Sequence, residues 1–422
     1  MIERDGWMSS GRSSVVAAIT RSRVGMVLTV VFLAVLLWLG GAPLTYDEPW
    51  YLETVGLLHE HGLTIDFLRH LPGPAGPLYT VVHALFEPVT RLAPPAVRWV
   101  NPLLLGLTIL AVNGTLRSAQ RQDRWSVAAT CFAIPMTWPC AGLALTEIPA
   151  VCAYAVHLAC LTRCLQGDSR HRLWAVLAGV ALGAATLGRQ PLLLGALPLV
   201  YVGVRDTARR GDIAVLLAVA CACVLPVFAV WGGVVPPKTA AIVGGGLSSR
   251  HVILAGAYAA ACTAIVCPDI LVWKPRLVAV CVVAAVGIAS VDPFAVSLPL
   301  HTLTARVVPG SVLPWATRVM QLLVIGAGLW FYASCAITLA RRSDDMMFTF
   351  VLGSVLLQVL SALAVKHQFS GRYLLTAMPL FAWLAAERRP GSRAGHLRLC
   401  LGGAIGCASL INYLKGAGPF DM

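Results

Sequence analysis

The sequence predicts an all-α, polytopic integral membrane protein. Of its 422 residues, 58% are hydrophobic and only 12% are charged, and the mean hydropathy is +0.77. A soluble chain of this length could not bury so much apolar surface. The apolar residues are also grouped into successive segments separated by short polar connections, which is the pattern of repeated membrane spans. These two observations exclude a soluble protein.

The first apolar segment indicates a retained membrane anchor. Residues 1–23 are polar and contain four arginines, and the first predicted transmembrane helix covers residues 24–42. This apolar stretch is longer than that of a cleaved signal peptide, and it lacks a convincing small-residue cleavage site. We therefore expect residues 1–23 to form a cytoplasmic N-terminal segment.

About twelve further apolar segments follow, which gives about 13 predicted transmembrane helices. Several are shorter than the ~20 residues that a perpendicular span needs, notably the two that flank Arg189. We expect residues 99–414 to form the helical bundle and residues 415–422 to form a short external tail. The predicted segments lie at about 99–116, 125–145, 148–165, 173–187, 191–204, 213–235, 251–268, 277–298, 319–340, 346–365, 373–386 and 397–414.

Every second connection is rich in arginine, which predicts the orientation of the chain. Basic connections are retained in the cytoplasm, so the formal net charge of +13 reflects topology and not a nucleic-acid surface. The alternation places residues 45–53, Glu147, Arg189 and residues 366–372 together on one external face. The basic residues are Arg117, Arg121, Arg124, Arg163, Arg170, Arg172, Arg205, Arg209, Arg210, Lys274, Arg276, Arg341, Arg342, Arg388, Arg389 and Arg393.

The first external loop, residues 43–98, has an unusual composition. It contains six acidic residues and three arginines, the reverse of the balance in the whole chain. Its pattern predicts two short amphipathic helices on the membrane surface, joined by the proline- and glycine-rich turn at residues 72–77. In the second helix we expect Leu85 and Val89 on the apolar face, and His83 and Glu87 on the opposite face.

Asp47 and Glu48 open this loop at the start of a predicted helix. Pro49 follows them, and proline is favoured in the first turn of a helix while restricting the preceding residue to extended conformations. The helix dipole favours negative charge at such an N-terminus. We therefore expect both carboxylates to be ionised, and able to accept a proton or to bind a cation.

Five short motifs resemble the GT-C glycosyltransferases. They are YDEPWY and PGPAGPLY in the first loop, ALTEIPA at residues 144–150, LGRQPLL at 187–193 and KHQFSGRYLLTAMPL at 366–380. GT-C enzymes are polytopic and transfer a sugar from a polyprenyl phosphate carrier. They include the aminoarabinose transferases of lipid A, the protein O-mannosyltransferases and the dolichol-dependent glucosyltransferases. The resemblance implies a GT-C-type fold, although the large soluble C-terminal domain of some members has no counterpart here.

The resemblance also implies roles for individual residues. Asp47 corresponds to the first-loop aspartate that acts as base or metal ligand, Glu48 would support it, and Glu147 could orient the acceptor or share a metal with Asp47. Phosphate would be bound by nearby cationic and amide groups, because arginine can bind two oxygens at once. These candidates are Arg189, Gln190, Lys366, His367 and Arg372; candidate substrate-binding aromatics are Tyr46, Tyr51, Tyr79 and Tyr373.

Other interpretations remain open at this point. Lys366 and His367 could simply mark the membrane interface, and Asp47 with Glu48 could be a helix cap. His59 and His61 are two residues apart, so on a helix they do not face one zinc ion. The sequence slightly favours metal-free catalysis. The alternative is a divalent metal ion held by Asp47 and Glu147.

The sequence predicts an inverting glycosyltransferase of the bacterial plasma membrane, acting on its external face. The donor would be a polyprenyl-phosphate-linked sugar, and the acceptor could be a glycan, a lipid or a protein. The alternatives are a transporter or lipid flippase, and a ligase or polymerase of lipid-linked glycans. A transporter is disfavoured because the sequence shows no internal repeat and its polar residues gather at one face.

Overall fold

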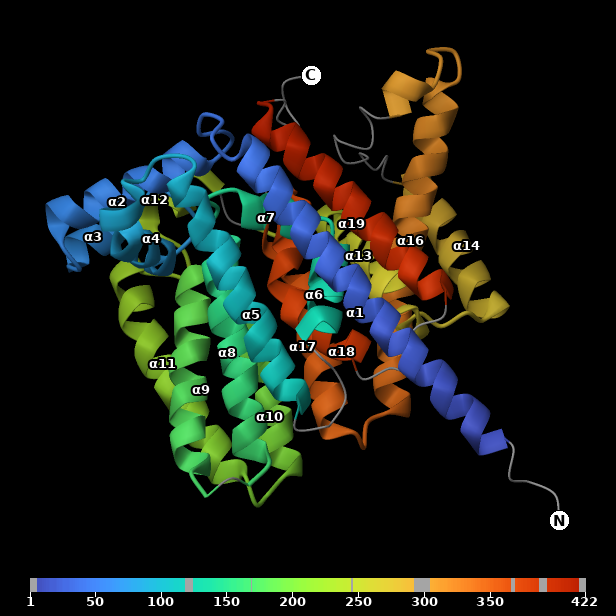
Figure 1. Ribbon diagram of the computed structural model, residues 1–422, viewed down its shortest axis with the longest axis horizontal. Helices are drawn as coiled ribbons and strands as arrows, with labels where there is room; N and C mark the ends of the chain where they lie inside the picture. Colours follow the sequence, from blue (N-terminus) through green and yellow to red (C-terminus); the bar gives the residue numbers. More distant parts are fainter. Residues whose placement is uncertain are drawn as a thin grey trace.

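The computed structural model describes residues 6–117, 124–167, 169–243, 246–291, 304–365, 369–386 and 393–416. Within these ranges the regular elements are α-helices and short 3-10 helices, and no β-strand occurs among them (Figure 1). The predicted all-α class is confirmed.

Nine helices of the described chain are long and apolar enough to cross a membrane. The prediction of a multi-pass membrane protein is therefore confirmed. The nine spans lie in α1 (Gly6–Leu39), α5 (Val100–Arg117), α8 (Glu147–Leu165), α9 (His171–Gly188), α11 (Arg210–Trp231), α13 (Ser249–Val266), α16 (Leu313–Arg341), α17 (Met346–Leu360) and α19 (Arg393–Leu414).

The remaining apolar segments form shorter or interrupted helices. α14 (Pro275–Val291) is a shorter helix, and α10 (Ala196–Arg205) is preceded by the 3-10 helix η2 (Gln190–Gly195). Two further segments are broken into pairs of short helices, so the count of about 13 spans stays a prediction. These pairs are α6 (Arg124–Ala133) with α7 (Thr137–Gly142), and η5 (Gly371–Ala377) with α18 (Met378–Ala386).

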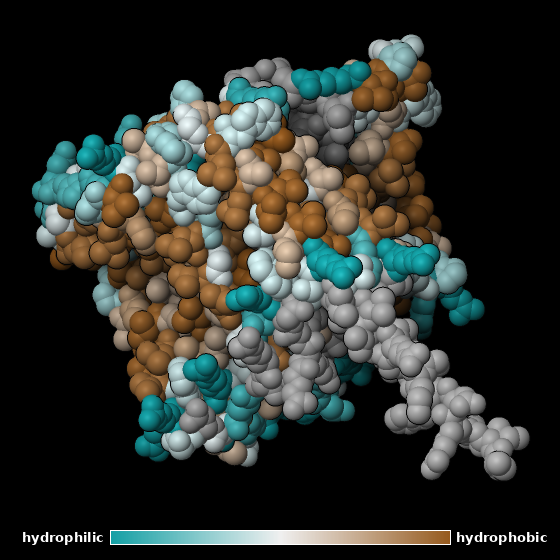
Figure 2. Space-filling model, viewed as in Figure 1, coloured by the Kyte–Doolittle hydropathy of each residue, from teal (hydrophilic) through white to brown (hydrophobic). Residues whose placement is uncertain are grey.

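The connections at one end of the bundle are held together by polar contacts. His171 at the start of α9 donates from Nδ1 to the carboxylate of Asp212 at the start of α11, with 2.8 Å between Nδ1 and Oδ2. Tyr201 at the end of α10 donates to the backbone carbonyl of Ser343, in the turn between α16 and α17. The Arg-rich connections that these residues border therefore lie at the same end, as the alternation predicted. Figure 2 shows a broad apolar surface between this end and the hydrophilic first loop.

The first loop covers the opposite end of the bundle with three helices, where the sequence predicted two. These are α2 (Glu48–His61), α3 (Ile65–His70) and α4 (Pro77–Thr90), followed by the 3-10 helix η1 (Ala96–Trp99). The loop docks on the end of α11, where the indole nitrogen of Trp231 donates to the carbonyl of Leu68 at 2.9 Å. The short helix α12 (Pro237–Val243) lies beside it, and Thr239 bonds the carbonyl of Pro72.

The orientation of α4 was predicted only in part. Leu85 and Val89 are 74% and 81% exposed, as expected for side chains that face lipid. The face that carries His83 is not open to water, because the side chain of His83 is fully buried. The imidazole packs on the ring of Tyr79, with 4.2 Å between centroids, since α4 lies against α8 and α9.

Candidate active site

Two carboxylates and two guanidinium groups meet at the end of the bundle that the first loop covers. A nitrogen of Arg372 lies 2.7 Å from Oδ2 of Asp47, and its Nε lies 3.6 Å from Oε1 of Glu147. Arg189 forms a second ion pair with Glu147. We call Asp47, Glu147, Arg189 and Arg372 the charged quartet. The structure thus joins four residues that the sequence placed on one face from four separate segments.

Burial differs sharply within the quartet. The side chains of Glu147 and Arg189 are 1% and 6% exposed, and that of Arg372 is 10% exposed. Asp47 is 27% exposed and is therefore the most accessible member. In such a partly dehydrated site, charge-assisted hydrogen bonds are strong because water screens them poorly.

Local sequence explains why the carboxylates occupy these positions. Asp47 is the N-cap of α2, with Pro49 in the first turn, and Glu147 is the first residue of α8. Both carboxylates therefore lie at the positive ends of helix dipoles. Arg189 follows the last residue of α9, where the dipole favours a cation, and Arg372 lies in η5.

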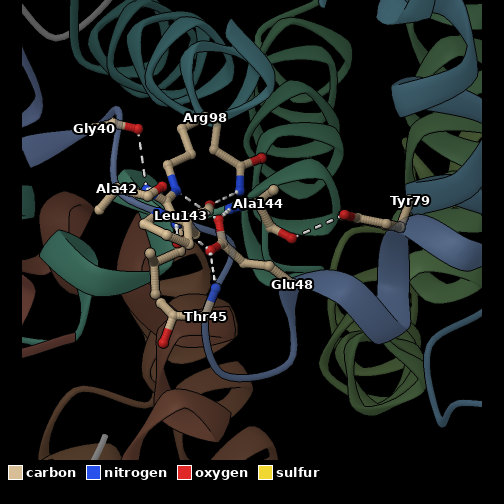
Figure 3. A network of polar contacts seen from close by, with 10 residues as sticks. Gly40, Ala42, Thr45, Glu48, Tyr79, Arg98, Leu143 and Ala144 are labelled. Carbon is tan, nitrogen blue, oxygen red and sulfur yellow. Dashed lines mark hydrogen bonds and ion pairs between the residues drawn. The ribbon is translucent and has the colours of Figure 1, made fainter. Parts of the chain in front are cut away.

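Glu48 lies in a network of polar contacts with Arg98, Thr45 and Ala144 (Figure 3). The guanidinium of Arg98 binds it at two points, with 2.9 Å to Oε1 and 2.5 Å to Oε2. The backbone amides of Thr45 and Ala144 each donate to Glu48 at 2.9 Å. Neither side chain of this pair is exposed. The carboxylate is saturated with donors, which favours a structural role over proton transfer.

The same network fixes the loop that precedes Glu147. Tyr79 donates its hydroxyl to the carbonyl of Ala144 at 2.8 Å, and Asn101 donates its amide to the carbonyls of Leu143 and Leu145 at 2.6 and 3.0 Å. Arg98 also donates to the carbonyls of Gly40, Ala42 and Pro43, just before Asp47. Arg98 therefore fixes the backbone just before Asp47, and Asn101 fixes the backbone just before Glu147. Sequence reasoning missed both residues; two polar side chains at the entrance to an apolar span were the available signal.

The turn at residues 72–77 is anchored beside Arg189. Gln190 donates its amide to the carbonyl of Pro74 at 2.6 Å, so this side chain is engaged with the protein itself. Gly76 approaches the end of α9 so closely that a Cβ there would lie 2.1 Å from the carbonyl oxygen of Leu187. Any side chain at this position would push the turn away from Arg189.

Aromatic side chains surround Arg372. Its guanidinium lies 5.3 Å from the ring centroid of Tyr46, which packs edge-to-face on Tyr413. Tyr46 and Tyr373 are half-buried, and burial raises the pKa of the Tyr46 phenol, so Tyr46 is neutral near pH 7. Tyr51 is 2% exposed, and its hydroxyl has no hydrogen-bond partner among the described residues. Tyr413 was not predicted.

Tyr79 differs from the other three tyrosines proposed for substrate contact. It is 1% exposed and its hydroxyl is used by Ala144, so its position suits support of the site. The predicted phosphate ligands Lys366 and His367 lie outside the described residues. The chain on either side of them is well anchored: His251 on α13 contacts the carbonyl of Val365, and Phe369 packs on Tyr258 with 5.8 Å between centroids.

The carboxylates of the charged quartet are not arranged as the ligands of a metal ion. Asp47 and Glu147 are bridged by Arg372, and Arg189 is also paired with Glu147, so two cations already balance the two carboxylates. Within the described part of the chain, no group of three histidine, cysteine, aspartate or glutamate side chains is arranged to hold a metal ion. His59 instead bonds Glu87 at 2.5 Å, and the ring of His61 stacks on His70. The expectation that these histidines do not bind zinc stays a prediction.

Comparison with known proteins finds similarity among solved structures. No family model and no curated protein matches the chain. The chain is similar to two crystal structures of ArnT from Cupriavidus metallidurans, each covering 92% of this chain and 77% of the other. The apo structure gives a TM-score of 0.42 at 17% identity, and the structure bound to undecaprenyl phosphate gives 0.45 at 16%.

Proposed function

We propose that this chain is an inverting, membrane-embedded glycosyltransferase that uses a polyprenyl-phosphate-linked sugar at the external face of a bacterial plasma membrane. The charged quartet is the observation that carries the proposal. It supplies two guanidinium groups for a phosphate and an accessible carboxylate, Asp47, for proton transfer. All lie at the end of a membrane bundle, where a lipid-linked phosphate would be located.

The chemistry follows from these groups. The acceptor hydroxyl attacks the anomeric carbon of the sugar and gives its proton to Asp47. The bond between that carbon and the phosphate oxygen breaks, and the electron pair leaves with the polyprenyl phosphate. Arg189 and Arg372 stabilise the charge that develops on the phosphate, an effect that is large in a poorly hydrated site. A single displacement of this kind inverts the anomeric centre.

In the resting protein Arg372 is paired with Asp47, so the base is not free. A phosphate that binds Arg372 through two oxygens competes directly with this carboxylate. We propose that donor binding draws Arg372 away and thereby frees Asp47 for the acceptor. Glu147 stays with Arg189 beneath them and orients the phosphate ligands.

We propose that the reaction needs no metal ion. Asp47 and Glu147 are the carboxylates available for a shared ion, and the guanidinium of Arg372 bridges them. A divalent ion would have to displace this group before it could contact both. The metal-dependent alternative predicts that a chelator abolishes transfer and that Glu147→Gln is as severe as Asp47→Asn.

The test is transfer by the purified protein from a panel of polyprenyl-phosphate sugars, chosen from lipids that copurify with it. Asp47→Asn keeps the shape of the side chain but cannot accept the proton, so turnover should fall by on the order of 10²-fold. Donor binding and thermal stability should change little. Each protein is assayed with and without chelator, and neither rate should respond.

Asp66→Asn is the matched control, because Asp66 is an exposed acid in the same loop. It should retain wild-type turnover. Full activity in a well-folded Asp47→Asn protein would show that Asp47 is not the base. Loss of activity on chelation would show that the mechanism depends on a metal ion. Absence of transfer from every polyprenyl-phosphate sugar would refute the proposed function itself.

A further inference from the structure

Two tyrosine rings from remote parts of the sequence meet beside Arg372, and the proposed reaction uses neither of them. The guanidinium carbon of Arg372 lies 5.3 Å from the ring centroid of Tyr46. The ring of Tyr413, on α19, packs edge-to-face on Tyr46, with 5.3 Å between centroids and 66° between the ring planes. Both tyrosines are half-buried. Tyr413 therefore supports the ring that contacts Arg372.

The backbone of Tyr46 has an unusual conformation. Its φ angle of 57° lies in the left-handed region, which is uncommon for residues other than glycine. Glu48 closes the turn around it, because its backbone N–H donates to the carbonyl of Thr45 and its carboxylate accepts from the amide of Thr45. A glycine would adopt this conformation without strain. A tyrosine at this position therefore points to a function of the ring.

The packing of α19 determines where Tyr413 lies. Leu410, one turn earlier on the helix, is 0% exposed. It lies so close to Gly142, at the end of α7, that a Cβ on the glycine would be 2.5 Å from Cδ1 of Leu410. The same helix packs against α1 and α6. Tyr413 is thus carried to the charged quartet by a helix that is closely packed on its neighbours.

Arg372 makes two different kinds of contact. Its ion pair with Asp47, at 2.7 Å, and its contact with Glu147, at 3.6 Å, both engage guanidinium nitrogens. The ring of Tyr46 instead attracts the cation through its quadrupole and occupies no N–H donor. Arg372 can therefore transfer its donors from Asp47 to a phosphate while it keeps its contact with the ring.

We propose that Tyr46 and Tyr413 form an aromatic brace that holds the guanidinium of Arg372 in place while it exchanges Asp47 for the donor phosphate. This statement rests on the proposed function. Tyr413 is a positioning residue, because it acts on Arg372 through the ring of Tyr46. Tyr46 in turn serves the phosphate ligand and not the sugar.

Chemical labelling of Arg372 tests the brace without any assay of activity. Phenylglyoxal modifies the arginines that it can reach, and mass spectrometry of peptides from the protein in lipid nanodiscs gives the rate at each one. Tyr413→Leu should raise the rate at Arg372 about threefold, because the ring beside the guanidinium is no longer held. Tyr413→Phe keeps the aromatic contact and should match the wild type.

Arg189 is the internal control, because it belongs to the same quartet and pairs with Glu147. Its rate should be equal in the wild type and in both variants. Equal rates at Arg372 in Tyr413→Leu and Tyr413→Phe would overturn the brace. A parallel rise at Arg189 in Tyr413→Leu would show general loosening of the site, and it would overturn the brace as well.

A second substitution shows whether Tyr413 acts through Tyr46. Tyr46→Gly removes the ring but suits the left-handed backbone, so the turn should persist. This variant should also label faster at Arg372, and adding Tyr413→Leu to it should give no further increase, since the two residues act in series. A further increase of the same size in the double variant would refute the positioning role of Tyr413.

Binding of undecaprenyl phosphate to the purified protein tests the link to the donor. The Kd of Tyr413→Leu should be about fivefold above that of Tyr413→Phe, with similar thermal stability. In turnover the change should appear in the KM for the donor and not in kcat, because the ring contact is present before and during transfer. Equal affinities would refute the role of the brace in donor binding. If the wild type neither binds a polyprenyl phosphate nor transfers a sugar, the proposed function fails, yet the labelling of Arg372 still decides whether the brace exists.

Discussion

Glu48 and Arg98 form a two-point ion pair at the base of the first loop, with neither side chain exposed. Asp47, the residue before Glu48, differs from it, because Asp47 is the most accessible member of the charged quartet. The two adjacent acidic residues therefore have different roles. Glu48 fixes the loop, and Asp47 is left available for chemistry.

This division predicts different consequences for stability. Breaking a buried ion pair by removing one partner costs about 3–5 kcal/mol, because the other charge stays buried. We expect Arg98→Lys to lower the thermal unfolding temperature in lipid nanodiscs clearly, since an ammonium group cannot match the fork of contacts that Arg98 makes. Arg69→Lys, at an exposed position of the same loop, should leave the temperature unchanged. A wild-type unfolding temperature for Arg98→Lys would contradict the structural role.

Arg189 and Arg372 should both matter for the donor. Replacing either by lysine turns a planar fork into a point charge, so kcat/KM for the donor should fall on the order of 10-fold. Steady-state kinetics at varied donor concentration measure this change. Lys238→Ala is the control, because Lys238 is exposed in α12 near the same loop. Unchanged kinetics in both arginine variants would discard the assignment of the phosphate site.

His83 predicts a dependence of stability on pH. Burial lowers the pKa of His83 to about 3, whereas the unfolded chain has an ordinary histidine pKa of about 6.5. Between these values the unfolded state binds a proton that the folded state does not, so stability is lost as the pH falls from about 6.5 toward 3.

The variant His83→Phe tests this prediction. It should lose part of the drop in unfolding temperature that the wild type shows between pH 7 and pH 5. His70→Phe, at an exposed position, should keep the full drop. An identical pH profile for wild type and His83→Phe would show that His83 does not contribute.

The sidedness of the membrane can be tested with single added cysteines. Glu60 and Thr207 are exposed at opposite ends of the bundle. The positive-inside rule predicts that an impermeant maleimide added to intact cells labels Glu60→Cys and spares Thr207→Cys. The parent chain, which carries its 13 native cysteines, provides the background. The reverse pattern of labelling would show the opposite orientation, with the quartet on the cytoplasmic side of the membrane.

The sequence could predict the spans and the shared end because these depend on local composition. Apolar runs and arginine-rich connections are contiguous, so Glu147, Arg189 and Arg372 could be assigned to one end before their distances were known. The helix start at Asp47 was equally local, because Pro49 marks it.

Contacts between remote residues were not readable in this way. Arg98 follows Glu48 by 50 positions, and nothing in one sequence pairs them. The burial of His83 depends on α8 and α9 covering one side of α4, which periodicity within α4 cannot show. For the same reason the sequence alone could not show that the hydroxyl of Tyr79 donates to the carbonyl of Ala144.

The charged quartet contains two formal negative and two formal positive charges, so it is electrically neutral before any substrate arrives. An anionic phosphate adds a charge that these four residues leave unbalanced. Because the neutral quartet has no surplus positive charge, long-range attraction contributes little to the free energy of donor binding, which should come mainly from the short contacts of Arg189 and Arg372 with the phosphate oxygens. Donor affinity should therefore change little with ionic strength, which binding titrations in buffers of low and high salt would measure. The neutrality of the resting quartet thus makes recognition of the lipid depend on contact geometry and not on the ionic atmosphere.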